Sequence, residues 1–191
     1  MSLPVRIWAA ALLLAALLAG LVTRETLARN AGQEARLAMQ TVDPRGLLTG
    51  HYVDLQLTEA LAPGVACPAG LESAPNKLGW IALRPGPDFA HVSGYAARRA
   101  DAARLGPMVM RGKAYCYAAP ERRDMAGWVT LDIGVRRFHT DQAQAEALAK
   151  ALSDRRTGEA TAFAVVSVGQ DGKARLKGVI VGGRRADLTW Y

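Results

Sequence analysis

The side chains that could carry chemistry in this chain are few and widely spaced. The three histidines are His51, His91 and His139. A zinc site gathers several histidine, cysteine or acidic ligands, often as pairs a helical turn apart. The histidines lie far from one another in the sequence and have no acidic cluster beside them. We therefore predict no metal site and no cofactor.

A serine nucleophile with a lysine base is a second possibility, because membrane-anchored signal peptidases use this pair. Ser73 is the first serine after the amino-terminal apolar segment, and Lys77 lies four positions later within the same proline-rich stretch. A catalytic lysine needs a desolvating apolar setting, which this stretch does not offer. We predict no catalytic residues and favour a non-enzymatic role. A membrane-anchored hydrolase or ligand-binding enzyme of another type is the alternative.

The two cysteines, Cys67 and Cys116, form a candidate disulfide. An even number of cysteines in an oxidising compartment favours a bridge, whereas two separate buried thiols are the alternative. A bridge requires Cα atoms less than about 7 Å apart. The C-x-x-C spacing of zinc and redox sites is absent.

The amino-terminal segment is the clearest element of the chain. Residues 3–22 are apolar except for Arg6, whose long side chain can reach the lipid headgroups. About 20 helical residues at ~1.5 Å each cross a hydrocarbon core of ~30 Å. We predict that residues 1–23 are a retained transmembrane signal-anchor that contacts the lipid bilayer through residues 3–22. A cleaved signal peptide is the alternative, disfavoured because no small-residue cleavage site comes directly after the run.

Charge and composition bear on compartment and partners. The chain has 24 lysines and arginines against 17 acidic residues. The arginines occur as scattered pairs, which indicates a solvated or lipid-facing surface and no nucleic-acid partner. Richness in arginine and alanine indicates a bacterial genome of high GC content. Cations flank both ends of the apolar segment and do not fix its orientation. Because a signal-like segment usually exports the domain behind it, we expect a single-pass protein of the cytoplasmic (inner) membrane with a periplasmic domain.

Hydrophobic periodicity and turn residues predict the remaining elements. Residues 24–42 predict a helical stalk that ends before Pro44, since proline cannot continue a helix. Residues 60–77 predict a long loop, residues 141–152 a short helix, and residues 170–172 a hairpin turn. Runs typical of short strands cover residues 52–57, 79–83, 88–95, 108–117, 128–133, 161–168 and 174–181. The predicted fold is α+β: a transmembrane helix, then an extracytoplasmic domain over residues 43–191 with a mostly antiparallel sheet or partial barrel and one or two short helices.

Residues 43–57, Asp-Pro-Arg-Gly-Leu-Leu-Thr-Gly-His-Tyr-Val-Asp-Leu-Gln-Leu, carry a recognisable motif. This segment resembles the one that names the GDYXXLXY family of membrane-anchored bacterial proteins. Gly50, Tyr52 and Leu55 match the family pattern. His51 stands where the family has aspartate, and Leu57 where it has tyrosine.

The resemblance extends along the chain, to residues 133–138 before a short helix and to a closing hairpin that contains Asp171-Gly172 and Gly182-Gly183. It implies an anchored extracytoplasmic domain, often working beside another integral membrane protein, and it brings no activity with it. We accordingly expect an accessory or interaction domain.

The motif residues have both a structural and a functional interpretation. Gly50 suits a turn with positive φ, Tyr52 can bury its ring, and Arg45 can pair with Asp54 or Asp43. We favour a turn that starts the sheet, with a ligand-binding turn as the alternative. The binding candidates are Arg45, Gly50, His51, Tyr52 and Asp54. Alternation along the strand places Leu55 and Leu57 on one face, predicted to be buried, and Tyr52 on the other.

Overall fold

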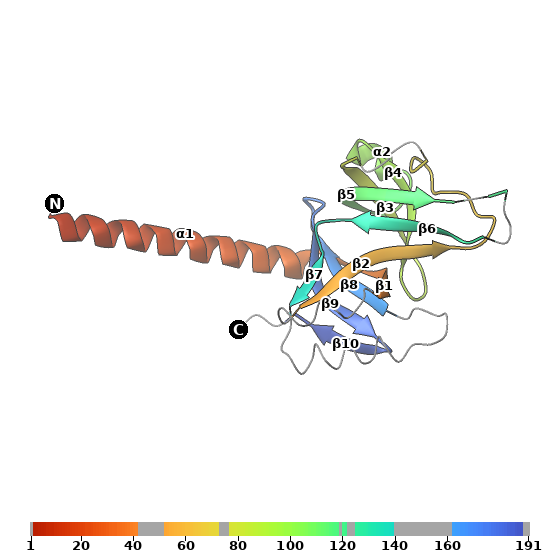
Figure 1. The fold of residues 1–191 in the computed structure, drawn as a ribbon. Helices are drawn as coiled ribbons and strands as arrows, with labels where there is room; N and C mark the ends of the chain where they lie inside the picture. Colours follow the sequence, from red (N-terminus) through yellow and green to blue (C-terminus); the bar gives the residue numbers. More distant parts are fainter. Residues whose placement is uncertain are drawn as a thin grey trace.

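A long helix projects from a β-sheet domain in the computed structural model (Figure 1). The structure describes residues 2–41, 52–72, 77–118, 120–121, 125–139 and 162–188. Helix α1 (Leu3–Ala31) has no buried residue, and its leucine side chains are exposed along its length. A helix of this length and composition can cross a membrane.

In the described residues, the domain consists of strands and one short helix. In chain order they are β1 (Gln33–Thr41), β2 (Tyr52–Leu61), β3 (Gly79–Pro85), β4 (Ala90–Ala96), α2 (Arg99–Ala102), β5 (Met108–Tyr117), β6 (Gly127–Asp132), β7 (Arg137–His139), β8 (Ala162–Val168), β9 (Ala174–Val181) and β10 (Arg184–Asp187). The predicted strands at residues 108–117 and 174–181 have the predicted bounds, and the others agree within a few residues. The helix predicted over residues 141–152 lies outside the described residues.

Strand β1 corrects the prediction of a helical stalk over residues 24–42. The helix ends at Ala31, and residues 33–41 pair antiparallel with both β2 and β8. Ala35, Leu37 and Met39 alternate with more exposed residues and are buried. Alanine, leucine and methionine favour helices in isolation, but a central position between two strands overrides that propensity.

Gly32 is the only residue between α1 and β1, so the helix runs directly into the sheet. A Cβ atom at Gly32 would lie 2.1 Å from Ser167 Oγ and 2.9 Å from the carbonyl oxygen of Val168. Glycine is therefore required here for the close approach of the incoming chain to β8.

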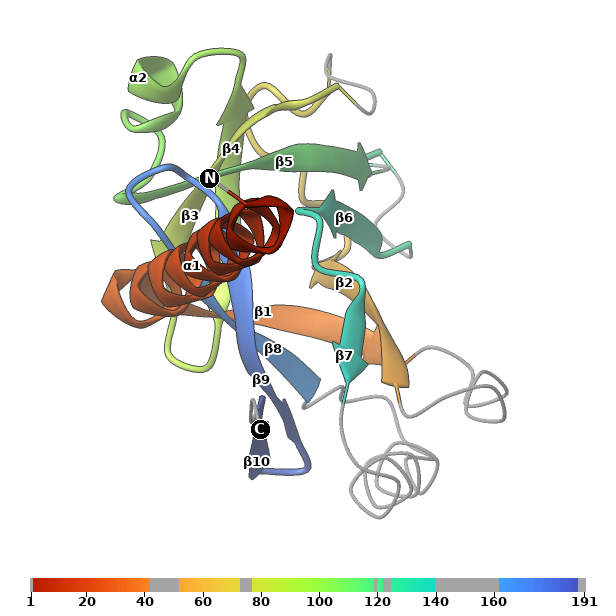
Figure 2. The same cartoon turned by 90° about the vertical axis from the view of Figure 1, so that its left-hand side faces the viewer.

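The sheet has the strand order β10-β9-β8-β1-β2-β6-β5-β3-β4, with β7 paired to β2 outside this path. All of the pairings between these strands are antiparallel. The order ends at β10 and at β4, so the sheet is open. The prediction of an α+β fold with a mostly antiparallel sheet is confirmed. Figure 2 shows β3, β4 and β5 on one side of β1 and β2, and β9 and β10 on the other.

The core consists of apolar side chains from both halves of the sheet. The largest fully buried apolar side chains are Phe138, Leu37, Leu57, Ile81, Leu83, Met110, Val129, Val165, Val166 and Val179. All of them except Val165 belong to one cluster that includes residues from both sides of β1 and β2, so one continuous core holds the domain together.

Candidate functional site

The motif segment enters the described structure at the start of β2. Arg45, Gly50 and His51 lie outside the described residues, and Tyr52 and Asp54 are described only as backbone. Leu55 is 7% exposed and Leu57 is 1% exposed, as predicted for the buried face. The position of the Tyr52 side chain stays a prediction.

The first residues of β2 pair with β7. Tyr52 lies opposite His139 and Asp54 lies opposite Arg137. The backbone N–H of Leu55 donates to the carbonyl oxygen of Arg136 at 2.7 Å. The structure thus brings together the two distant segments on which the family resemblance rests, residues 52–57 and 133–138, and this pairing supports a structural role for the motif.

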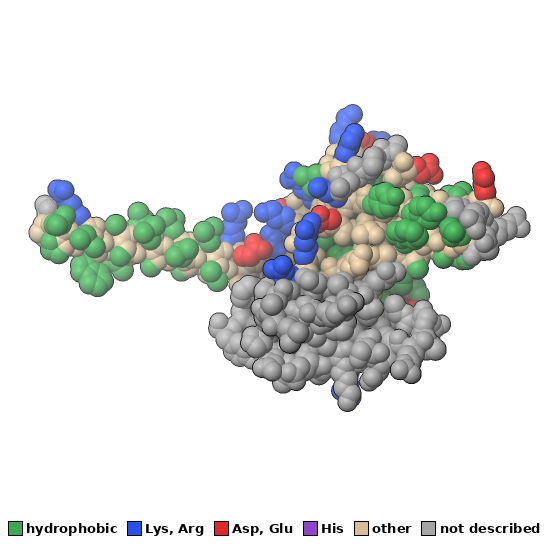
Figure 3. Space-filling view, viewed as in Figure 1, with side chains coloured by type: hydrophobic (Ala, Val, Ile, Leu, Met, Phe, Trp, Pro, Cys, Tyr) green, Lys and Arg blue, Asp and Glu red, His purple; other side chains and the backbone are tan. Residues whose placement is uncertain are grey.

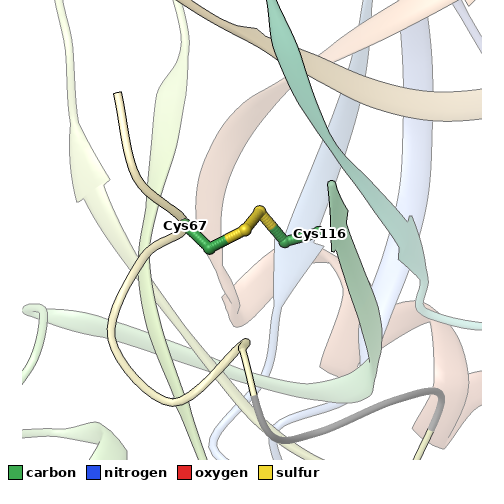
Figure 4. Close-up of a disulfide and its surroundings, with 2 residues drawn as sticks. All are labelled: Cys67 and Cys116. Atoms are coloured by element: carbon green, nitrogen blue, oxygen red, sulfur yellow. A yellow bond between two sulfur atoms is a disulfide. The ribbon is translucent and has the colours of Figure 1, made fainter. Parts of the chain in front are cut away.

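Cys67 and Cys116 are joined by a disulfide (Figure 4). Their Cα atoms are 6.0 Å apart, within the predicted limit, and the two residues are 49 positions apart in the sequence. The bridge ties the irregular segment after β2 to the end of β5. Both residues pack against the hydrophobic core, so the disulfide extends the core to a segment that has little regular structure.

Arg175 connects the helix to the sheet. Its Nε donates to Glu25 Oε1 at 2.5 Å, and its Nη2 donates to Asp171 Oδ2 at 2.9 Å. The Arg175 side chain is only 9% exposed. Its hydrogen bond lowers the pKa of Asp171 to about 2, and the two carboxylates raise the pKa of Arg175. We call these three residues the helix–hairpin junction.

Residues outside the helix–hairpin junction also form hydrogen bonds to the turn between β8 and β9. Arg99 donates to the carbonyl oxygen of Gln170, and the backbone N–H of Arg111 donates to that of Gly172, both at 2.7 Å. Gly172 has a φ of 75°, and a Cβ there would lie 2.3 Å from the Trp80 ring. The turn is therefore fixed between α1 and the β3–β5 part of the sheet, which sets the direction in which the helix leaves the domain.

A cleft with a volume of about 580 Å³ lies between the carboxyl-terminal part of α1 and this turn. The residues that line it are Leu21, Arg24, Glu25, Ala28, Ala31, Gly32, Gly169, Gln170, Asp171, Lys173 and Arg175. The sequence indicated the hairpin turn but gave no sign of the cleft, because Glu25 and Arg175 are 150 residues apart.

Glu59 is a buried carboxylate that the sequence did not single out. It is 8% exposed, and its oxygens accept a hydrogen bond from the backbone N–H of Val92 at 2.9 Å and contact His91 Nδ1 at 2.8 Å. Because both oxygens have a partner, Glu59 links β2 to β4 and is not set up as a free base.

An exposed aromatic group lies on β5 and β6. Tyr115, Tyr117 and Trp128 are 50%, 37% and 39% exposed, and the rings of Tyr117 and Trp128 stack with centroids 4.5 Å apart. We call these residues the aromatic face. Figure 3 shows hydrophobic side chains gathered over β5 and β6.

Within the described residues, nothing resembles a metal centre or an activated nucleophile. No three histidine, cysteine or acidic side chains gather in that part of the chain. Ser93 and Ser167 have buried hydroxyls without a hydrogen-bond partner, so no base activates either of them. Ser73 lies outside the described residues, and Lys77 is exposed. The described residues therefore give the enzyme alternative no support.

The motif and the order of the elements agree with one family. A family model described as "GDYXXLXY protein" matches residues 14–179. The chain belongs to the GDYXXLXY family. The match begins inside α1 and ends in β9, so the GDYXXLXY region includes the end of the helix together with most of the sheet. No curated protein and no solved structure matches the chain.

Proposed function

We propose that this GDYXXLXY protein is a single-pass, membrane-anchored accessory domain that lies on the periplasmic side of the cytoplasmic membrane and acts with another integral membrane protein. In this proposal residues 1–23 form the signal-anchor and the sheet forms the extracytoplasmic domain. The helix–hairpin junction is the observation that carries it.

The helix–hairpin junction supports retention of the helix over cleavage. Arg175 is almost fully covered and depends on Glu25 for one of its two carboxylate partners. Thr26-Leu27-Ala28 ends in a small residue and is a possible cleavage site several residues past the apolar run. Cleavage after Ala28 would remove Glu25 and expose one side of Arg175. The ion pair between Arg175 and Glu25 can stabilise the mature protein only if the helix is retained.

The disulfide supports the compartment. Structural disulfides persist in oxidising compartments such as the bacterial periplasm and are rare in the reducing cytosol. The bridge between Cys67 and Cys116 ties the irregular segment after β2 to the end of β5. An oxidising location is therefore the one in which the domain is most stable.

The aromatic face supports a protein partner. Tyrosine and tryptophan are enriched at protein interfaces, where they provide most of the binding energy. The helix–hairpin junction fixes the angle between α1 and the sheet, so the aromatic face is held in one orientation relative to the membrane. A fixed orientation suits a partner that lies in the same membrane.

Affinity capture of the full-length protein from detergent-solubilised membranes tests this proposal. We expect an integral membrane protein to be captured, and Trp128→Ala to reduce its recovery at least about tenfold, the loss typical of an interface hot spot. Leu78→Ala is the matched control, because Leu78 is 58% exposed and lies outside the aromatic face. Capture of no membrane protein, or equal losses in both variants, would contradict the proposal.

A further inference from the structure

We propose that the cleft between α1 and the β8–β9 turn binds the phosphate group of a phospholipid, and preferably of an anionic one. The proposal rests on the membrane anchoring of the proposed function, and it assigns a ligand to a site that lies outside the motif segment, residues 43–57.

The position of the cleft along α1 places it at the level of the lipid headgroups. Residues 3–22 span a hydrocarbon core of ~30 Å, and each headgroup layer adds about 5–8 Å, or roughly three to five helical residues. That layer therefore surrounds residues 23–27 of α1. Arg24 and Glu25 line the cleft at this level, and Leu21 lies at its hydrocarbon end.

The turn between β8 and β9 reaches the same depth. Arg175 contacts Glu25 at 2.5 Å and Asp171 at 2.9 Å, so the turn lies beside the part of the helix that crosses the headgroups. Figure 1 shows the β8–β9 turn, drawn in blue, near the carboxyl-terminal end of α1, where the helix meets the sheet. A headgroup next to α1 is thus in contact with residues of the turn as well.

The charges in the cleft suit one phosphodiester. Arg175 is engaged by two carboxylates, so the helix–hairpin junction carries a net charge of minus one. Arg24 and Lys173 also line the cleft and add two positive charges, which leaves it with a net charge of plus one. A single phosphodiester restores neutrality. Figure 3 shows lysine and arginine side chains gathered where α1 meets the domain.

Arg24 and Lys173 are the residues assigned to the phosphate. Both are exposed, and Lys173 is held next to the junction because its backbone N–H donates to Asp171 Oδ1 at 3.0 Å. Guanidinium and ammonium groups are the usual partners of phosphate oxygens. The carboxylates of Glu25 and Asp171 are occupied by Arg175, which leaves the two cations for the ligand.

The test uses the full-length protein, first stripped of lipid in detergent and then supplied with phosphatidylglycerol or phosphatidylcholine. Bound lipid is counted by native mass spectrometry. We expect phosphatidylglycerol to be retained in preference to phosphatidylcholine, and Arg24→Gln/Lys173→Gln to weaken retention roughly 10- to 30-fold, about fivefold for each cation near a membrane surface. Equal retention of the two lipids would overturn the proposal.

Three controls separate the possible causes of a loss. Arg98→Gln/Arg104→Gln removes the same net charge from the surroundings of α2, where both side chains are exposed, and should retain lipid normally. Arg24→Lys/Lys173→Arg keeps the charges and should also retain it. An equal loss in the α2 variant, or a loss in the charge-keeping variant, would overturn the assignment to this cleft.

Titration of the lipid-free protein with inorganic phosphate is the third control, and it distinguishes the source of the phosphate. It should show binding much weaker than that of phosphatidylglycerol, and equal affinity would assign the site to free phosphate instead.

Alkaline carbonate extraction of membranes tests separately whether the protein is anchored. If the protein resists extraction but shows no lipid preference, only the proposed lipid site is contradicted. If carbonate releases the protein from the membrane, the proposed function is contradicted as well.

Discussion

Arg175 of β9 and Glu25 of α1 are 150 residues apart in the sequence and are joined by a hydrogen bond of 2.5 Å. This contact gives α1 a defined direction relative to the sheet. The nearly buried guanidinium also orients Asp171 at the turn, so one side chain organises both the helix exit and the hairpin.

Replacing Arg175 should loosen this arrangement. Arg175→Ala removes charge-assisted hydrogen bonds to two carboxylates, and we expect a loss of about 1–3 kcal/mol in the free energy of unfolding. Glu25→Gln should cost less than about 1 kcal/mol, because Glu25 is mostly exposed and water replaces its partner. Urea unfolding of the full-length protein in detergent measures both. A larger loss for Glu25→Gln than for Arg175→Ala would contradict this prediction.

The helix–hairpin junction should also respond to acid. The pKa of Asp171 is about 2 in the folded protein, against 3.8 for an unperturbed aspartate. Because the folded value is the lower one, the stabilisation is complete above pH 3.8 and is lost as the pH falls from there toward 2. Unfolding measured across this range should show the loss in the wild type and a smaller one in Asp171→Asn. Parallel curves for the two proteins would exclude this contribution.

The disulfide should matter for stability and should be formed in cells. Reduction, or Cys67→Ser/Cys116→Ser, should lower the free energy of unfolding by about 2–4 kcal/mol, the usual contribution of a native bridge. Thermal unfolding with and without a reductant measures the loss. Thiol labelling of denatured protein taken directly from membranes should find neither cysteine reactive, and reactive thiols would count against an oxidising compartment.

Substitutions of the motif residues Leu55 and Tyr52 should have different effects on the protein. Leu55 is 7% exposed, and Leu55→Ala should cost about 2–5 kcal/mol and lower the amount of protein without a specific loss of partner capture. Tyr52→Phe removes only a hydroxyl and should leave both protein level and capture unchanged. Normal accumulation of Tyr52→Phe together with lost capture would show that the motif is a binding site.

The sequence by itself determined the elements whose signal is local. The apolar run of α1 needs only its own composition to indicate a membrane helix. Strand β5 alternates along residues 108–117, and the Asp171-Gly172 turn carries its own chemistry, so both could be predicted from short windows. The disulfide could also be proposed from the sequence, because two cysteines allow only one pairing within the chain.

Only the tertiary structure decided the features that depend on distant partners. Residues 33–41 have the composition of a helix, and they form β1 because β2 and β8 lie on either side and bury Leu37 and Met39. Glu25 and Arg175 are ordinary surface residue types that no local pattern distinguishes, and the turn pattern at Asp171 indicates neither of them as a partner. They meet because the β8–β9 hairpin folds back onto the end of α1, and a contact between segments 150 residues apart is set by the whole chain and not by either segment alone.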